Sequence, residues 1–285
     1  MWIHFALFST LLLPAALLGL RGRAGRRGSP VLLGVAFVAF VAFSSLRAVS
    51  VGNDTVEYHR VFKAIAATDS FQEALSVSRF ESGYVLVNYL VSRLTQDFNL
   101  LLLITSVFVY GSAVLFIKRY AASYSLALLF AFGMSVFYDL MLAVRQGIAV
   151  AIFLLAVPAL MERKLVRYVL LVVLASQFHV SVLLMLVVYL IPYMRLSTFG
   201  DWFKWGALIG IVMFSLSWLL TRLLVSSAYY GHYLHSDYAD GGVRSATVLL
   251  IVTRIILMLL AATCGWNAAV EADPSGRTRN LLALA

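Results

Sequence analysis

Of the 285 residues, 62% are hydrophobic and 12% are charged, and the formal net charge is +9. Because a soluble globular domain has about 25% charged residues, this composition excludes an ordinary soluble domain and predicts an all-α, polytopic transmembrane helix bundle. In such a protein the Lys and Arg residues orient the helices, and we expect no nucleic acid as a partner.

The apolar runs predict the membrane spans. One crossing needs about 20 mostly apolar residues, so we expect about eight or nine spans in a single integral membrane domain. That domain covers residues 1–285. The candidate spans are residues 2–20, 31–50, 98–117, 124–141, 146–161, 166–193, 205–225 and 245–264. A cleavable signal peptide has positive charges before its apolar run, whereas here the positive charges follow the first run. We therefore interpret the first run as a membrane span that is retained.

The distribution of arginine predicts the orientation of the spans. Four arginines lie between the first two spans, at positions 21, 23, 26 and 27, and the positive-inside rule keeps them in the cytoplasm. The N-terminus is therefore expected outside. By alternation, residues 51–97 and the corner at 139–145 are also expected outside.

The apolar stretch 166–193 has two interpretations, because polar residues 176–181 lie at its middle. It is either one long tilted span or two shorter segments that meet at His179. One span places Arg195 and Lys204 outside, whereas a reversal at His179 places them inside. The reversal agrees better with the positive-inside rule.

Residues 51–97 are predicted to form an extracytoplasmic amphipathic segment. Residues 56–67 and 84–94 have apolar side chains at helical spacing, and residues 68–70 are polar residues that can cap a short helix. Such helices lie along a membrane surface.

Ionisable and aromatic residues gather at the predicted outer ends of the apolar helices. The candidate site residues are Arg47, Asp54, Tyr58, Arg60, Glu81, Tyr84, Arg145, Gln146 and His179. A charge at membrane depth costs several kcal/mol unless it is paired or hydrated, so Arg145, which begins an apolar run, is a functional candidate. The competing interpretations are an interfacial anchor for Arg145, solvated carboxylates for Asp54 and Glu81, and a hydrogen bond between helices for His179.

Taken together, these side chains suit a lipid-linked phosphate. The guanidinium group of arginine can bind two phosphate oxygens at once, while the hydrocarbon tail of the lipid remains in the bilayer. The topology with a reversal at His179 allows all of the clusters to meet on one side of the membrane.

The succession of these motifs resembles the EpsG family, which consists of Wzy-like exopolysaccharide and capsule polymerases. The matching residues are 52–58 with Phe62, 80–84, 145–146 with Ala149, and Ala175 with 178–181. Members of the family usually continue for further spans, so the resemblance implies that this chain is truncated at its C-terminus.

The resemblance implies a glycosyltransferase-type polymerase in the bacterial inner membrane. It would join undecaprenyl-pyrophosphate-linked repeat units at the outer face, next to other exopolysaccharide assembly proteins. Arg145 would bind the pyrophosphate, and His179 would be a second phosphate contact or a proton donor. Arg47 or Arg60 would assist. The other expected substrate-binding residues are Tyr58, Tyr84 and Gln146.

For the general base, Asp54 is the first choice, because it directly follows a span, and Glu81 is the second. We expect no cofactor and no essential metal, since arginine can supply the counter-charge to phosphate. The competing functions are a flippase or transporter, a membrane acyltransferase and a non-catalytic assembly component.

Overall fold

The computed structural model describes residues 28–52 and 54–193, with isolated helical residues between 204 and 219 and at 252. Every regular element in this part of the chain is a helix, which confirms the all-α prediction there. The chain divides into two compact units, residues 1–155 with 173–180, and residues 156–172 with 181–285. The candidate span at 2–20 lies outside the described residues, that at 245–264 does so except for residue 252, and that at 205–225 is described only in part.

Ten helices are described in chain order. They are α3 (Pro30–Ser45), α4 (Thr55–Ala66), α5 (Phe71–Val77), α6 (Ser82–Ser92), α7 (Phe98–Tyr120), α8 (Tyr124–Gly133), α9 (Val136–Leu142), α10 (Val144–Met161), α11 (Leu165–Ser176) and the 3₁₀ helix η2 (Val180–Tyr193).

Helix α3 packs along α7 and contacts α8. The centre of this core is aromatic, with the Phe40 ring 4.5 Å from the Phe137 ring and 5.6 Å from the Tyr110 ring. The Tyr110 hydroxyl donates to the carbonyl of Phe137 at 3.2 Å, so the one polar atom of this ring is satisfied in the core. The core therefore fixes α3, α7 and α9 against one another.

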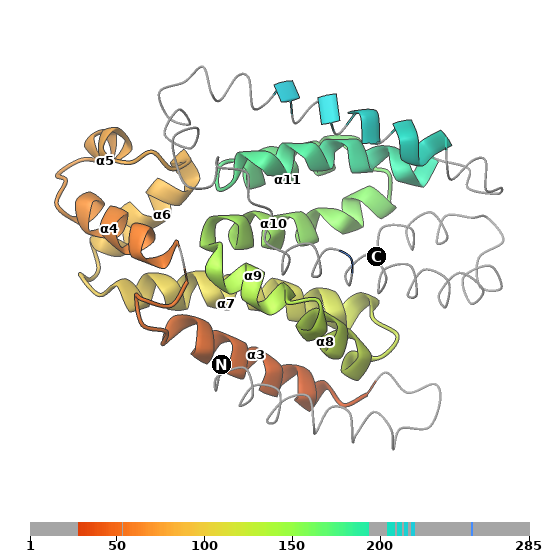
Figure 1. Ribbon diagram of the computed structural model, residues 1–285, viewed down its shortest axis with the longest axis horizontal. Coiled ribbons are helices and arrows are strands. Elements are labelled where there is room, and N and C mark those ends of the chain that lie inside the picture. Colours follow the sequence, from red (N-terminus) through yellow and green to blue (C-terminus); the bar gives the residue numbers. More distant parts are fainter. Residues whose placement is uncertain are drawn as a thin grey trace. The chain divides into compact units, whose positions relative to one another are not determined.

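The segment at 51–97 folds into α4, α5 and α6, which pack together at the N-terminal end of α7 (Figure 1). Helix α4 is amphipathic and buries Tyr58, Val61, Phe62 and Ile65 on one face. Ser70 accepts from the N–H of Glu73, whose carboxylate accepts from the N–H of Asp69. This reciprocal cap begins α5. The structure has the predicted helices and cap, whereas the assignment of the whole segment as amphipathic and outside the membrane stays a prediction.

Among the described residues, α7 and α10 are long and apolar enough to cross a membrane. Helices α8 and α9 form a third candidate if they are one span, but they are bent by 60°. The bend lies at Ser135, which has a left-handed backbone with φ of 60°. The expected continuous helix over 124–141 is therefore broken. Helices α3 and α11 are apolar but shorter, and the total of eight or nine spans stays a prediction.

Within the second unit, α11 and η2 run antiparallel. The Tyr168 hydroxyl donates to the carbonyl of Met185, and the Tyr189 hydroxyl donates to the carbonyl of Arg163 at 2.6 Å. The Arg163 guanidinium also lies over the Tyr193 ring at 4.5 Å. The chain therefore reverses between 176 and 180, as the two-segment interpretation of 166–193 requires.

Candidate functional site

The first turn of α6 is capped by a residue from far along the chain. The carbonyl of Gln177 accepts from the N–H groups of Gly83 at 2.8 Å and Tyr84 at 3.3 Å. Glu81 is the N-cap residue, but its side chain makes no capping hydrogen bond. Because the Gln177 carbonyl satisfies the free N–H groups of the helix, the Glu81 carboxylate can bond elsewhere.

Gly83 permits this close approach. A Cβ atom at this position would lie 2.7 Å from the Gln177 carbonyl oxygen. The Ser82 hydroxyl adds a side-chain contact, donating to the Gln177 side-chain oxygen at 2.9 Å. These contacts dock the turn after α11 onto the start of α6.

The Glu81 carboxylate lies at the centre of the candidate site. One of its oxygens accepts from Arg145, and both side chains are only 13% exposed. The other oxygen accepts from the N–H of Val180 at 3.2 Å and lies 3.9 Å from Nδ1 of His179. The structure therefore brings together three sequence-predicted residues from α6, α10 and the turn after α11.

The Arg145 side chain lies against a cluster of three aromatic rings, Tyr58, Phe80 and Tyr84, which we call the aromatic platform. Its guanidinium lies 4.1 Å from the centre of the Phe80 ring, within the range of a cation–π interaction, and hydrogen-bonds to Tyr58. The rings of Phe80, Tyr58 and Tyr84 are mutually 5.6 to 5.7 Å apart. Burial raises the pKa of the Tyr84 hydroxyl, which therefore stays protonated at neutral pH. The platform fixes the direction of the Arg145 fork.

Arg47, which follows α3, is a second buried arginine. It is 7% exposed, and it donates to the carbonyl of Ser44 at 2.5 Å and to the Ser44 hydroxyl at 3.1 Å. Ser106 of α7 donates to the same hydroxyl at 2.7 Å and so supports it. Among the described residues, no carboxylate forms an ion pair with Arg47.

Several buried polar atoms in this region have no hydrogen-bond partner among the described residues. They are Nε and Nη2 of Arg47, Nε of Arg145, the Tyr84 hydroxyl and Nδ1 of His179. An unsatisfied buried donor costs about 1–3 kcal/mol, so native proteins rarely gather several in one region without a ligand or water to accept them. These atoms suit a ligand rich in acceptor oxygens.

The structure places three of the sequence-predicted residues outside these contacts. The Asp54 side chain is exposed at the start of α4 and makes no capping hydrogen bond. The Arg60 side chain is 72% exposed and pairs with Glu57. The Gln146 side chain is exposed beside Arg145. The geometry thus favours Glu81 over Asp54, although Asp54 is the first choice from sequence.

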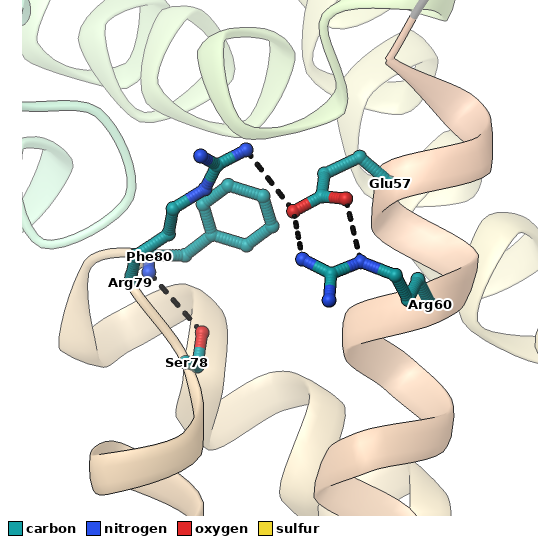
Figure 2. A network of polar contacts seen from close by, with 5 residues as sticks. All are labelled: Glu57, Arg60, Ser78, Arg79 and Phe80. Atoms are coloured by element: carbon teal, nitrogen blue, oxygen red, sulfur yellow. Dashed lines mark hydrogen bonds and ion pairs between the residues drawn. The ribbon is translucent and has the colours of Figure 1, made fainter. Parts of the chain in front are cut away.

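Four residues outside the predicted site residues also take part, namely Gln177, Phe80, Glu57 and Arg79, although all but Arg79 belong to the polar clusters that the sequence shows. Figure 2 shows Glu57 of α4 paired with Arg60 and with Arg79, the residue before Phe80. The hydrogen bond from Arg60, with further attraction from Arg79, lowers the pKa of Glu57 despite its partial burial. The opposite charges of Glu57 and Arg79 are visible in the sequence. Their pairing, between α4 and the segment that joins α5 to α6, is not, and Gln177 acts mainly through its backbone carbonyl.

In the part of the chain that the structure describes, no three His, Cys, Asp or Glu residues are arranged to hold a metal ion. The expectation that the protein needs neither metal nor cofactor stays a prediction.

The model of the EpsG family matches residues 31–271. The chain therefore belongs to the EpsG family, as its motifs suggest, and this membership indicates a membrane protein of the broad Wzy-like polysaccharide polymerase class. None of the curated proteins and none of the solved structures compared with the chain matches it.

Proposed function

We propose that the protein polymerises oligosaccharide repeat units carried on undecaprenyl diphosphate at the outer face of a bacterial inner membrane. Family membership supports the broad class of polysaccharide polymerase. The observation that carries the finer proposal is the buried Glu81–Arg145 pair, with His179 beside it and unsatisfied donors on Arg47, Arg145 and Tyr84.

The donors account for recognition of the diphosphate. Arg145 uses its Nε–H, and Arg47 its Nε–H and Nη2–H, to bind phosphate oxygens, since these donors have no partner among the described residues. The Tyr58, Phe80 and Tyr84 platform holds the Arg145 fork in place, so little conformational entropy is lost on binding. The hydrocarbon tail of the carrier remains in the bilayer. Gln146, exposed beside Arg145, faces incoming substrate.

The transfer moves the growing glycan from its carrier to a new unit. The bond between the anomeric carbon and the diphosphate oxygen breaks, and the electron pair leaves with the diphosphate. An acceptor sugar hydroxyl forms the new bond to the anomeric carbon, and its proton passes to Glu81. Arg145 stabilises the charge that develops on the leaving diphosphate.

Two contacts orient Glu81 in the proposed site. Arg145 donates to one of its carboxylate oxygens. The N–H of Val180 keeps the carboxylate oriented. His179 is placed to contact the diphosphate or to donate a proton.

One observation favours the transporter alternative. Helices α8 and α9 form a bent pair, and broken helices are frequent in transporters. A transporter defect would trap lipid-linked single units at the inner face of the membrane, whereas a polymerase defect would leave them at the outer face. The side on which the units accumulate therefore separates these two functions.

The test is the length of the glycan made in a strain that lacks the gene. The strain is complemented with the wild-type protein, Glu81→Gln or Arg145→Gln, and membrane levels of each are measured. Asp54→Asn and Arg60→Gln are matched controls, because they remove the same charges at exposed positions outside the proposed site. We expect single lipid-linked units at the outer face for the first two variants and full-length polymer for the controls. Full-length polymer from Glu81→Gln and Arg145→Gln would refute the assigned site, and full-length polymer in the strain that lacks the gene would refute the function.

A further inference from the structure

Glu57 of α4 pairs with two arginines at once (Figure 2). Arg60 donates to both carboxylate oxygens, at 2.8 and 2.7 Å. Arg79 donates to one of the same oxygens at 3.0 Å. The carboxylate therefore holds two cations in different parts of the chain.

The two pairs differ in what they connect. Arg60 is on the same helix as Glu57, one turn further on, and its side chain is 72% exposed. Arg79 belongs to the segment between α5 and α6, and its side chain is 34% exposed. Only the Arg79 pair therefore joins α4 to another element.

The segment held by Arg79 leads directly into the candidate site. The next residue, Phe80, contacts Tyr58 with its ring at 5.6 Å and carries the Arg145 guanidinium at 4.1 Å. The N–H of Phe80 donates to the Ser78 hydroxyl at 3.1 Å, which tightens the turn (Figure 2). The residue after Phe80 is Glu81.

Two neighbouring contacts thus fasten this segment to α4. The Glu57–Arg79 ion pair forms one contact, and the Tyr58–Phe80 ring pair, one residue further along each segment, forms the other. The two rings are buried, whereas the side chains of the ion pair are partly exposed to solvent. Loss of the ion pair leaves the Tyr58–Phe80 ring contact as the remaining one of these two links between α4 and the segment.

We propose that Glu57 and Arg79 are positioning residues for the polymerase site. Their ion pair clamps the Phe80–Glu81 segment against α4, so that the Glu81 carboxylate keeps its place between Arg145 and His179. Neither residue touches the substrate. The proposal rests on the function proposed above, because it assigns Glu57 and Arg79 an effect that acts through Glu81.

The clamp acts on catalysis more than on folding. A partly exposed ion pair adds little to stability, whereas a misplacement of a reacting group by about 1 Å costs on the order of 100-fold in rate. The backbone of Arg145 belongs to α10 and Arg47 follows α3, so both arginines stay available to the diphosphate, although the Arg145 guanidinium also contacts the Phe80 ring. Binding of the lipid diphosphate should therefore change less than turnover when the clamp is broken.

The test uses the full chain purified in detergent, with lipid-linked repeat units extracted from the gene-deleted strain as substrate. For Arg79→Gln we expect kcat to fall by roughly 10- to 100-fold, with KM for the lipid-linked unit within about threefold of wild type. Arg60→Gln is the matched control. It removes the other cation from the same carboxylate, and we expect both constants within about twofold of wild type.

Restoration of the pair supplies the second part of the test. Arg79→Lys keeps the charge and one donor, and we expect it to recover most of kcat. The second restoration variant carries the double exchange Glu57→Arg with Arg79→Glu. It is made in an Arg60→Gln background, because Arg60 would otherwise repel the new arginine within α4. We expect this variant to be more active than either single exchange. If Arg79→Gln does not reach the membrane, Arg79→Lys and the double exchange provide the readout.

The outcomes separate the two proposals. If the wild type forms no polymer from lipid-linked units, the proposed function fails, and if Glu81→Gln and Arg145→Gln are as active as an active wild type, the proposed site fails. If those two are inactive while Arg79→Gln behaves like Arg60→Gln, only the clamp is overturned. A low kcat for Arg79→Gln that neither lysine nor the double exchange improves would likewise overturn the clamp.

Discussion

The backbone N–H of Gly83 donates a 2.8 Å hydrogen bond to the carbonyl of Gln177. This bond joins the start of α6 to the turn after α11, and it places Glu81 beside His179, 3.9 Å away. Capping by Gln177 leaves the Glu81 carboxylate available to Arg145. A backbone contact between distant segments thus assembles the candidate site.

The first prediction concerns Gly83→Ala. The added Cβ would lie 2.7 Å from the Gln177 carbonyl oxygen, so the turn must move away from α6. We expect polymerisation to fall at least tenfold, because a shift of about 1 Å at a reacting group costs on the order of 100-fold. Gly111→Ala is the control, since its Cβ would meet Phe37 at an ordinary 3.7 Å. Equal activity of the two variants, at equal membrane levels, would argue against the docking role.

The second prediction concerns Arg145→Lys. Lysine keeps the positive charge but lacks the planar fork that contacts Glu81, Tyr58 and the Phe80 face. The loss of one charge-assisted hydrogen bond is worth about 1.5–3 kcal/mol, so we expect roughly a 10- to 100-fold loss of kcat/KM. Measurement of kcat/KM with extracted lipid-linked units tests this. Wild-type kcat/KM would mean that charge alone suffices.

The third prediction concerns Arg47→Met. Because this arginine is buried without a carboxylate partner among the described residues, its removal should not destabilise the protein and can stabilise it. Undecaprenyl diphosphate should raise the melting temperature of the wild type and of Arg60→Gln, but raise that of Arg47→Met much less. A thermal unfolding series in detergent measures both effects. The same ligand-induced shift in all three proteins would remove Arg47 from the site.

The fourth prediction concerns pH and Glu57. Pairing lowers the pKa of Glu57 in the folded protein below its ordinary value of 4.5. Its contribution to stability is therefore fully present above that ordinary value and is lost as the pH falls through the lowered pKa. The difference in unfolding free energy between wild type and Glu57→Gln should stay constant from about pH 7 to pH 5 and shrink in stronger acid. A difference that disappears by about pH 6 would contradict the assignment.

Local features of this chain were predictable from its sequence. The apolar spacing of Tyr58, Phe62 and Ile65 predicts one buried face of α4, and the polar residues before α5 predict its cap. These features depend on residues within one or two turns of each other. Periodicity and capping chemistry therefore suffice to find them.

The arrangement of the site was only partly predictable. Glu81, Arg145 and His179 are identifiable as charged or polar residues beside apolar runs, but their contacts span long stretches of chain that no local pattern encodes. Asp54 has the same sequence signal as Glu81, and only the fold distinguishes the exposed carboxylate from the half-buried one. The break at Ser135 lies two residues after Gly133, but one glycine inside an apolar run does not by itself predict a break.

The most direct test of the account is a reaction with purified components. The wild-type protein, Glu81→Gln and Arg145→Gln are each incubated with lipid-linked repeat units extracted from the gene-deleted strain, and polymer and free lipid diphosphate are measured together. We predict that the wild type releases one lipid diphosphate for each linkage formed and that both variants release almost none while remaining folded. Polymer formation by either variant at the wild-type rate would contradict the assignment of Glu81 and Arg145 as the centre of the site.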